Sequence, residues 1–166
     1  MSRLGAADLA DVRCSTAPET FDADLRALLC RQDLDPEAFR YWQADMCSLP
    51  RHFFTISHAR EAQFRLATTD ADDCRRLHVD RRRLRLICTY QGPGTQWLAD
   101  AQVNRTALAQ CAPNDAVLRH GEPSQFEPFW VGLMQGDPGN NGQGLVHRSP
   151  PIAGSGQVRV LFCMDC

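Results

Sequence analysis

The stretch RLRLICTYQGPGT, residues 83–95, decides the fold class of this chain. Leu84 and Leu86 alternate with Arg83 and Arg85, and β-favouring residues continue to Tyr90, which is typical of a strand. The glycine–proline run that follows is typical of a turn. We therefore expect a sheet of antiparallel strands joined by turns around this segment.

The segments on both sides extend this pattern. Alternating or β-favouring residues predict further strands at 63–69, 126–134, 144–147 and 157–165. A short helix is expected within 103–112, capped by Asn104, and residues 135–144 form a long glycine-rich loop. The part of the chain after residue 52 is thus mainly β.

The first fifty residues have helical spacing instead. One apolar face is formed by Phe21, Leu25, Leu28 and Leu29. Asp35 and Pro36 suit the N-cap and first position of a second helix, and Pro50 is expected to end this region. Helices followed by strands indicate an α+β fold, with helices packed on a sandwich or barrel.

Length and composition fit one domain over residues 1–166, with a helical part at 1–50 and a β core at 52–166. Hydrophobic residues make up 43% of the chain, enough for a core. The net charge of −2 makes nucleic acid an unlikely partner, and no apolar run suggests a membrane segment. Without a recognisable signal peptide, we expect a cytoplasmic protein. The absence of Lys excludes lysine Schiff-base chemistry.

The eight cysteines are scattered and do not form two close pairs of zinc ligands. Only Cys163 and Cys166 have ligand spacing, and they could form a redox pair or half a zinc site. In a reducing cytosol we expect them to be free buried thiols. Cys74, four residues before His78, could approach a metal, although packing is the simpler role.

A candidate metal site combines His78 and Asp80 with a distant histidine. Side chains at positions i and i+2 of a strand point the same way, so His78 and Asp80 can face one ion. His147 starts a predicted strand after a flexible loop and is the candidate third ligand. Two histidines and one carboxylate with open positions are the ligand set of non-haem Fe(II) oxygenases.

A candidate anion anchor lies on the last predicted strand. Alternation places Arg159 opposite to Val158 and Val160. A guanidinium suits a carboxylate bidentately, and a buried arginine needs such a partner.

Taken in order, the HxD pair, TYQGPGT, the distal His followed by prolines and the last-strand Arg resemble the 2-oxoglutarate/Fe(II) dioxygenases, most of all the prolyl-hydroxylase branch. The resemblance implies a distorted double-stranded β-helix, jelly-roll or cupin-like, with iron bound by His78, Asp80 and His147. It also implies that Arg159 binds 2-oxoglutarate, with a hydrogen bond from Tyr90 or Thr89.

A closer resemblance covers residues of about 64–165. The pieces LHVD, RLICTYQGPGTQWL, VNR and GLVHRSPP resemble an uncharacterised bacterial domain of unknown function, numbered eighteen twenty-six. That family brings no activity with it.

Other residues have less context. Trp97, Arg85 and Arg148 could face a substrate, and Trp130 is expected in the core. The remaining histidines, His52, His58 and His120, are expected at the surface.

The function is left open between three classes. The first is a dioxygenase acting on an unknown small molecule or peptide. The second is a non-enzymatic protein that binds Zn(II) with the same ligands, and the third is a degenerate cupin-like scaffold. The oligomeric state cannot be read from the sequence.

Overall fold

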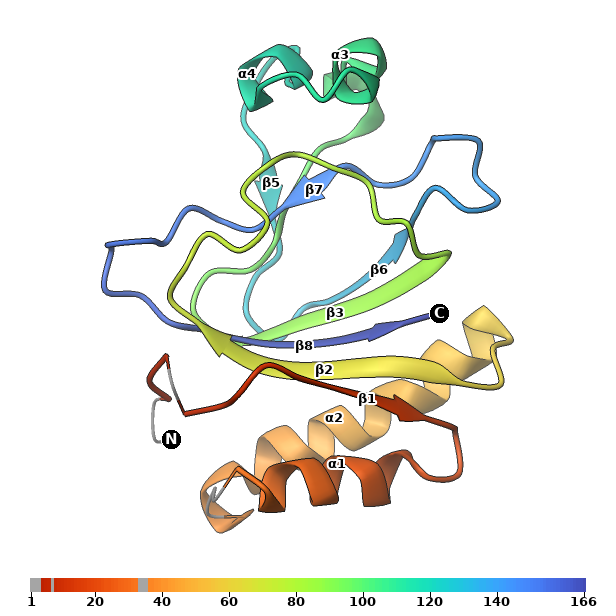
Figure 1. Cartoon of the computed structure of the whole chain (residues 1–166), viewed down its shortest axis with the longest axis vertical. Helices are drawn as coiled ribbons and strands as arrows, with labels where there is room; N and C mark the ends of the chain where they lie inside the picture. The colour runs from red at the N-terminus through yellow and green to blue at the C-terminus, as the bar shows by residue number, and fades with distance from the viewer. Residues whose placement is uncertain (1–3, 7, 33–35) are drawn as a thin grey trace.

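A computed structural model describes residues 4–6, 8–32 and 36–166 (Figure 1). The helices are α1 (Phe21–Cys30), α2 (Pro36–Ser57), α3 (Arg105–Ala109) and α4 (Asn114–Val117), with a 3-10 segment η1 (Asp100–Gln102). The strands are β1 (Val12–Thr16), β2 (Ala62–Thr69), β3 (Leu84–Gln91), β4 (Gln96–Trp97), β5 (Ser124–Gln125), β6 (Val131–Gln135), β7 (His147–Arg148) and β8 (Arg159–Asp165).

The strands form two antiparallel sheets. The larger sheet has the order β1-β2-β8-β3-β6, and the smaller sheet has the order β5-β4-β7. An isolated antiparallel bridge joins His78 to His147, so residue 78 lies beside β7. Together with the helices, this arrangement makes the fold α+β, as predicted.

Helices α1 and α2 cover one face of the larger sheet (Figure 1). The interface is aromatic: the ring centroid of Phe21 lies 5.1 Å from that of Phe64 and 6.0 Å from that of Phe162. Along β8, Val160 and Phe162 belong to this helix-side core, whereas Leu161 belongs to a cluster on the other face. Strand alternation therefore sends Arg159 and its alternate neighbours toward the smaller sheet.

The predicted apolar face of α1 is confirmed, because Phe21, Leu25, Leu28 and Leu29 are all buried. Helix α2 begins at Pro36 as expected, while the proposed cap Asp35 lies outside the described residues. Pro50 was expected to end the helical region, but it lies inside α2. Proline removes one helical hydrogen bond. The helix nevertheless continues, and the following turn buries Phe53 and Phe54 against the sheet.

The N-terminal region is also not wholly helical. Strand β1 pairs with β2, with Cys14 opposite Phe64, and extends the larger sheet. In β1, Val12 and Cys14 alternate with Arg13 and Ser15, a local strand pattern that the prediction of a helical N-terminal region overlooked.

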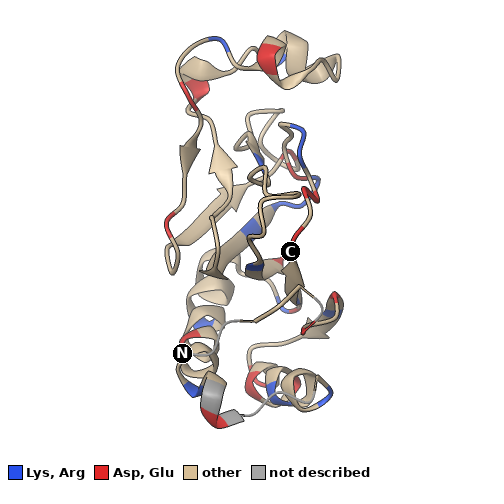
Figure 2. Ribbon diagram, turned by 90° about the vertical axis from the view of Figure 1, so that its left-hand side faces the viewer, with Lys and Arg blue, Asp and Glu red and all other residues tan. Residues whose placement is uncertain are grey.

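Helices α3 and α4 form a small lobe over the smaller sheet, at the opposite end of the molecule from α1 and α2 (Figure 1). Its core includes Leu98, Val103 and Val146. The predicted Asn104 cap is confirmed, since its side chain accepts a hydrogen bond from the Ala107 N–H at 3.2 Å. Basic and acidic residues are interspersed along the length of the molecule (Figure 2).

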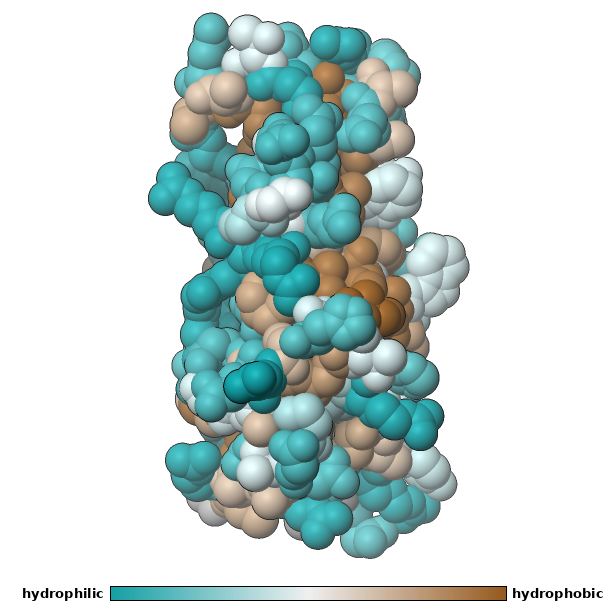
Figure 3. Space-filling view, turned by 90° about the vertical axis from the view of Figure 1, so that its right-hand side faces the viewer, coloured by the Kyte–Doolittle hydropathy of each residue, from teal (hydrophilic) through white to brown (hydrophobic). Residues whose placement is uncertain are grey.

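Strand β6 is shorter than predicted and forms one edge of the larger sheet. Trp130 was expected in the core, but it is 60% exposed. Its apolar neighbours Phe129, Val131 and Leu133 are exposed as well. Hydrophobic side chains gather at mid-height on the side of the molecule shown in Figure 3.

Among the described residues, no helix is long and apolar enough to cross a membrane.

Candidate metal centre

Two segments of backbone hold the candidate ligands together. The His78 N–H donates to the His147 carbonyl at 3.0 Å, and the His147 N–H donates to the His78 carbonyl at 2.9 Å. This reciprocal pair places the two imidazole centroids 4.4 Å apart. Asp80 follows two residues after His78, so its carboxylate reaches the same place.

Each histidine is oriented by a backbone carbonyl. Nδ1 of His78 lies 2.8 Å from the Arg76 carbonyl, and Nδ1 of His147 lies 3.0 Å from the Leu145 carbonyl. A carbonyl can only accept, so Nδ1 carries the proton in both rings. In the neutral form of each ring, Nε2 then keeps its lone pair, which is the orientation that metal-binding histidines adopt.

The carboxylate of Asp80 completes the group. Its Oδ1 lies 3.9 Å from Nε2 of His78, and its Oδ2 lies 3.5 Å from Nε2 of His147. One ligand atom from each residue lies within 4.8 Å of the others. Oδ2 is buried and has no hydrogen-bond donor among the described residues. A buried carboxylate oxygen is costly without a partner, so these donors fit a cation.

Arg85 supports the carboxylate from the side. It donates to Oδ1 of Asp80 at 2.9 Å and binds both carboxylate oxygens of Asp165, at 2.5 and 2.9 Å. Burial opposes the charge of Arg85, but these acidic partners raise its pKa above the usual value. Arg85 therefore stays charged and fixes Oδ1, leaving Oδ2 free to face His147.

His147 is the most enclosed of the three ligands. Its side chain is 5% exposed, against 34% for His78. Burial lowers the pKa of His147 below its usual value, although the charge of Asp80 opposes the shift. The imidazole is thus neutral at pH 7, as a metal ligand must be.

A pocket of about 640 Å³ opens beside the exposed half of the group. His78 and Asp80 line it together with Arg81, Arg105 and Asp137. A pocket of this size accommodates a small molecule or the side chain of a larger substrate.

The glycine-rich loop beside this pocket is tied to it. The Asp137 N–H donates to the Asp80 carbonyl at 2.9 Å. Arg105 donates to the carbonyls of Gly142 and Gly144, at 3.2 and 3.0 Å. The loop is thus held at two points, one of which is a candidate metal ligand.

Arg159 is fully buried, with 0% exposure. Its Nη2 donates to the Thr95 hydroxyl at 3.2 Å, but Nε and Nη1 have no partner among the described residues. Burial lowers the pKa of Arg159 to about 10, so it remains a cation at pH 7. A buried guanidinium with two free donors fits an anionic ligand.

The two residues expected beside Arg159 lie on opposite faces of β3. Thr89 is buried on the same alternating face as Ile87, toward the smaller sheet. Tyr90 faces the helices, where its hydroxyl donates to Asp45. Tyr90 therefore does not share a face with Arg159, and Thr89 does.

The three candidate substrate-facing residues lie in different environments. Trp97 is paired with His147 across the smaller sheet, and its ring lies 6.1 Å from that of Phe126, at 27°. Arg148 points to the opposite side of this sheet, where its Nε donates to Gln96 at 2.8 Å. Arg85 supports Asp80, as described above.

The cysteines do not join the candidate metal group. Within the described residues, the group consists of two histidines and one aspartate, and Cys74 is exposed nearby. Cys163 packs between the sheets and Cys166 packs against the helix-side core, so neither forms a disulfide. Burial raises the pKa of Cys163 to about 11, which keeps it a thiol. The remaining histidines, His52, His58 and His120, were expected at the surface, and all three are exposed.

One contributor to the site was not expected from the sequence. Asp165 fixes Arg85 and, through it, Asp80. Its alternation with Arg159 and Cys163 along β8 places it on the inner face, and that parity was the available signal.

The family model for "Protein of unknown function (DUF1826)" matches residues 1–165, so the chain belongs to this family. No curated protein matches the chain.

Proposed function

We propose that this member of the family is a non-haem Fe(II)- and 2-oxoglutarate-dependent dioxygenase, acting on a small molecule or peptide. The observation that carries the proposal is the group formed by His78, Asp80 and His147. Their ligand atoms lie within 4.8 Å of one another, and Oδ2 of Asp80 has no hydrogen-bond partner among the described residues. Such a set leaves coordination positions open for a co-substrate and O₂.

The strand order supports a double-stranded β-helix for this protein. One sheet contains β2-β8-β3-β6, and the other contains β5-β4-β7 with residue 78 bridged beside β7. All these pairings are antiparallel, and the chain passes back and forth between the sheets. This is the exchange between two facing sheets that a jelly-roll requires.

Arg159 is the proposed anchor for the far carboxylate of 2-oxoglutarate. It has two free donors, it lies between the sheets, and Thr95 already orients it. Thr89 shares this face and could add a hydrogen bond. The same buried cation without an anion would destabilise the fold, which favours a ligand at this position.

Bound iron would supply O₂ activation, driven by oxidative decarboxylation of 2-oxoglutarate. The protein itself would position the metal ligands and shield the site from water. Arg85 and Asp165 hold Asp80, the carbonyls of Arg76 and Leu145 hold the imidazoles, and the buried side of the group keeps water from His147.

The test is metal binding under anaerobic conditions, followed by titration with 2-oxoglutarate and a search for a charge-transfer band in the visible range. The proposal expects stoichiometric Fe(II), and a band lost in His147→Ala but retained in the exposed control His120→Ala. Metal binding that survives a His78→Ala/His147→Ala double substitution contradicts the proposal.

The two alternatives have distinct outcomes in the same experiment. Tight Zn(II) binding without a 2-oxoglutarate band identifies a zinc-binding protein. Negligible metal content, with His78→Ala harmless, identifies a scaffold.

A further inference from the structure

A second pocket, of about 500 Å³, lies beside the segment that precedes His78. Its lining comes from residues that flank the two histidines in the sequence, together with the start of α4. We call it the arginine pocket; it is lined by Asp72, Arg75, Arg76, Pro113, Asn114, Arg148, Ser149 and Pro151. The lining contains three guanidinium groups and one carboxylate, a formal excess of two positive charges.

The backbone of this pocket is fixed. Asn114 donates to the Arg75 carbonyl at 2.9 Å and accepts from the Leu77 N–H at 2.8 Å. On the other side, the Ser149 N–H donates to the Cys74 carbonyl at 2.9 Å. The pocket is therefore a built feature of the fold.

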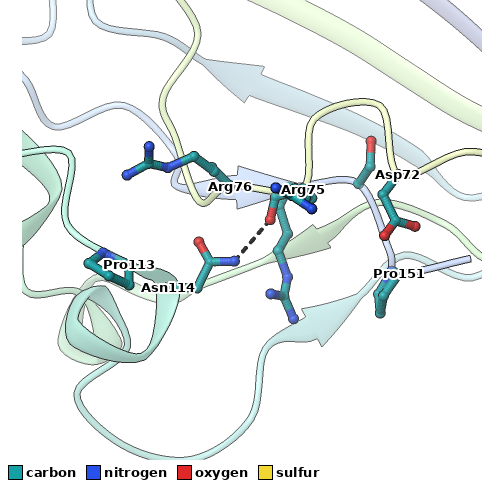
Figure 4. A pocket seen from close by; sticks show the side chains of 8 residues that line it. Asp72, Arg75, Arg76, Pro113, Asn114 and Pro151 are labelled. Carbon is teal, nitrogen blue, oxygen red and sulfur yellow. Dashed lines mark hydrogen bonds between the residues drawn. The ribbon is translucent and has the colours of Figure 1, made fainter. Parts of the chain in front are cut away.

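Two of its guanidinium groups are available to a ligand. Arg75 makes no hydrogen bond or ion pair through its side chain within the described part of the chain, and it extends between Asn114 and Pro151 (Figure 4). Arg148 uses Nε to bind Gln96, and this contact orients its two terminal nitrogens, for which the described residues offer no partner. Arg76 is occupied differently, since it donates to the carbonyls of Cys111 and Ala112.

The single acidic group does not neutralise these arginines. Oδ1 of Asp72 accepts the Ile152 and Ala153 N–H groups, at 2.7 and 2.8 Å. These hydrogen bonds hold the carboxylate at the loop before β8. Within the described residues it forms no ion pair with Arg75, although the two charges attract each other. The lining keeps its formal excess of two positive charges, which suits an anionic ligand.

The arginine pocket is continuous with the surface of the candidate metal group. A smaller pocket, of about 350 Å³, shares Arg75 and Arg76 with it and includes His78. A ligand bound at Arg75 could thus extend across Arg76 toward the exposed edge of His78.

We propose that the arginine pocket binds an oxyanion group, a phosphate or a carboxylate, of a small-molecule substrate. The role of substrate recognition rests on the proposed function, but binding of the anion does not need the metal. Arg75 and Arg148 would supply charge-assisted hydrogen bonds from two sides. This anion is distinct from the one proposed at Arg159, which lies between the sheets.

The test uses the full chain freed of metal with a chelator, so that no anion can bind through a metal ion. Inorganic phosphate and succinate are each titrated by calorimetry at constant ionic strength. The variants are Arg75→Gln, Arg148→Gln and the double substitution. Arg119→Gln is a matched control, because Arg119 is exposed and lies outside the pocket.

We expect saturable binding that each single substitution weakens about tenfold, as loss of one charge-assisted hydrogen bond implies, and that Arg119→Gln leaves unchanged. A preference for phosphate assigns a phosphorylated substrate, and a preference for succinate assigns a carboxylate substrate. Binding that survives the double substitution, or no saturable binding of either ion, overturns the proposal.

Metal affinity is measured separately on the same variants, so the two proposals can fail independently. We expect it to be unchanged, because within the described residues the side chains of Arg75 and Arg148 form no hydrogen bond or ion pair with the three candidate ligands. Anion binding without metal binding would support the proposal for the arginine pocket and contradict the proposed dioxygenase function.

Discussion

Arg85 donates to Oδ1 of Asp80 at 2.9 Å, while Oδ2 of the same carboxylate lies 3.5 Å from Nε2 of His147. The two oxygens thus have different tasks: one is held by a fixed cation, and the other is left without a donor. The hydrogen bond from Arg85 holds Oδ1, so Oδ2 is left facing Nε2 of His147.

The first prediction concerns this clamp. Arg85→Gln should weaken metal affinity about 10- to 100-fold, the usual effect of removing a group that orients a ligand. Competition with a chromophoric chelator measures the change. Arg82→Gln, at an exposed neighbouring position, is the control, and equal affinities for the two variants would contradict the role of Arg85.

The second prediction concerns the buried cation at Arg159. Arg159→Met should abolish 2-oxoglutarate binding yet stabilise the ligand-free protein by about 1–3 kcal/mol, because it removes a buried charge with unsatisfied donors. Urea denaturation and 2-oxoglutarate titration are the two measurements. Arg159→Lys keeps the charge and serves as the comparison. A destabilised Met variant that still binds 2-oxoglutarate would show that Arg159 is structural.

The third prediction concerns Gly136, at the start of the loop beside the metal group. A Cβ there would lie 1.9 Å from the Arg82 carbonyl oxygen and 2.5 Å from that of Asp80. Gly136→Ala should therefore displace the backbone that carries Asp80 and lower metal affinity. At Gly139 a Cβ meets no atom within 4 Å, and Asn tolerates the φ of +76°, so Gly139→Asn is the control. Equal metal affinities in the two variants would refute this prediction.

The fourth prediction is a pH dependence of the metal-free protein. Burial lowers the pKa of His147 in the folded state, so the unfolded chain binds this proton at a higher pH. The neutral histidine thus contributes stability above its ordinary pKa of about 6.5, and this is lost as the pH falls toward the folded value. The difference in free energy of unfolding between wild type and His147→Gln should therefore become smaller as the pH falls from about 7.5 to about 5.5, the interval in which a histidine titrates. An identical pH profile for both proteins in urea denaturation would exclude it.

A fifth prediction separates the cysteines by reactivity. Burial raises the pKa of Cys88 and Cys163 to about 11, whereas Cys30, Cys74 and Cys111 are exposed. Since the thiolate is the reactive form, brief alkylation of the native protein should label the three exposed cysteines and spare the two buried ones. Mass spectrometry of the digested protein reads the sites. If Cys163 were labelled as fast as Cys30, the space between the two sheets would be accessible to the reagent, which would contradict the prediction.

The sequence predicted the side chains that depend on strand parity. His78 and Asp80 lie close together as predicted, although only His78 forms a bridge and Asp80 is outside any strand. Arg159 faces the smaller sheet because Val160 faces the helices. The same parity explains Thr89 and Tyr90, which are adjacent and so cannot both face one ligand.

The predictions that were wrong concern segments whose structure depends on contacts between residues far apart in the sequence. Pro50 stays inside α2 because the residues after it are buried against the sheet, and β1 exists because β2 offers it an edge. Trp130 is exposed because it precedes an edge strand. The contacts at Pro50 and Trp130 leave no local pattern, so propensity alone cannot reveal them, whereas the alternation within β1 was a local signal.

The reciprocal hydrogen bonds between His78 and His147 have a mechanical consequence. They join two segments that are far apart along the chain, and a metal held by both side chains would tie the same two segments a second time. The ion would then act as a removable cross-link between the two segments, and because it binds only the folded state it would stabilise that state by its binding free energy. Chelation should therefore open the polypeptide to proteases between these two points before it affects α1 and α2.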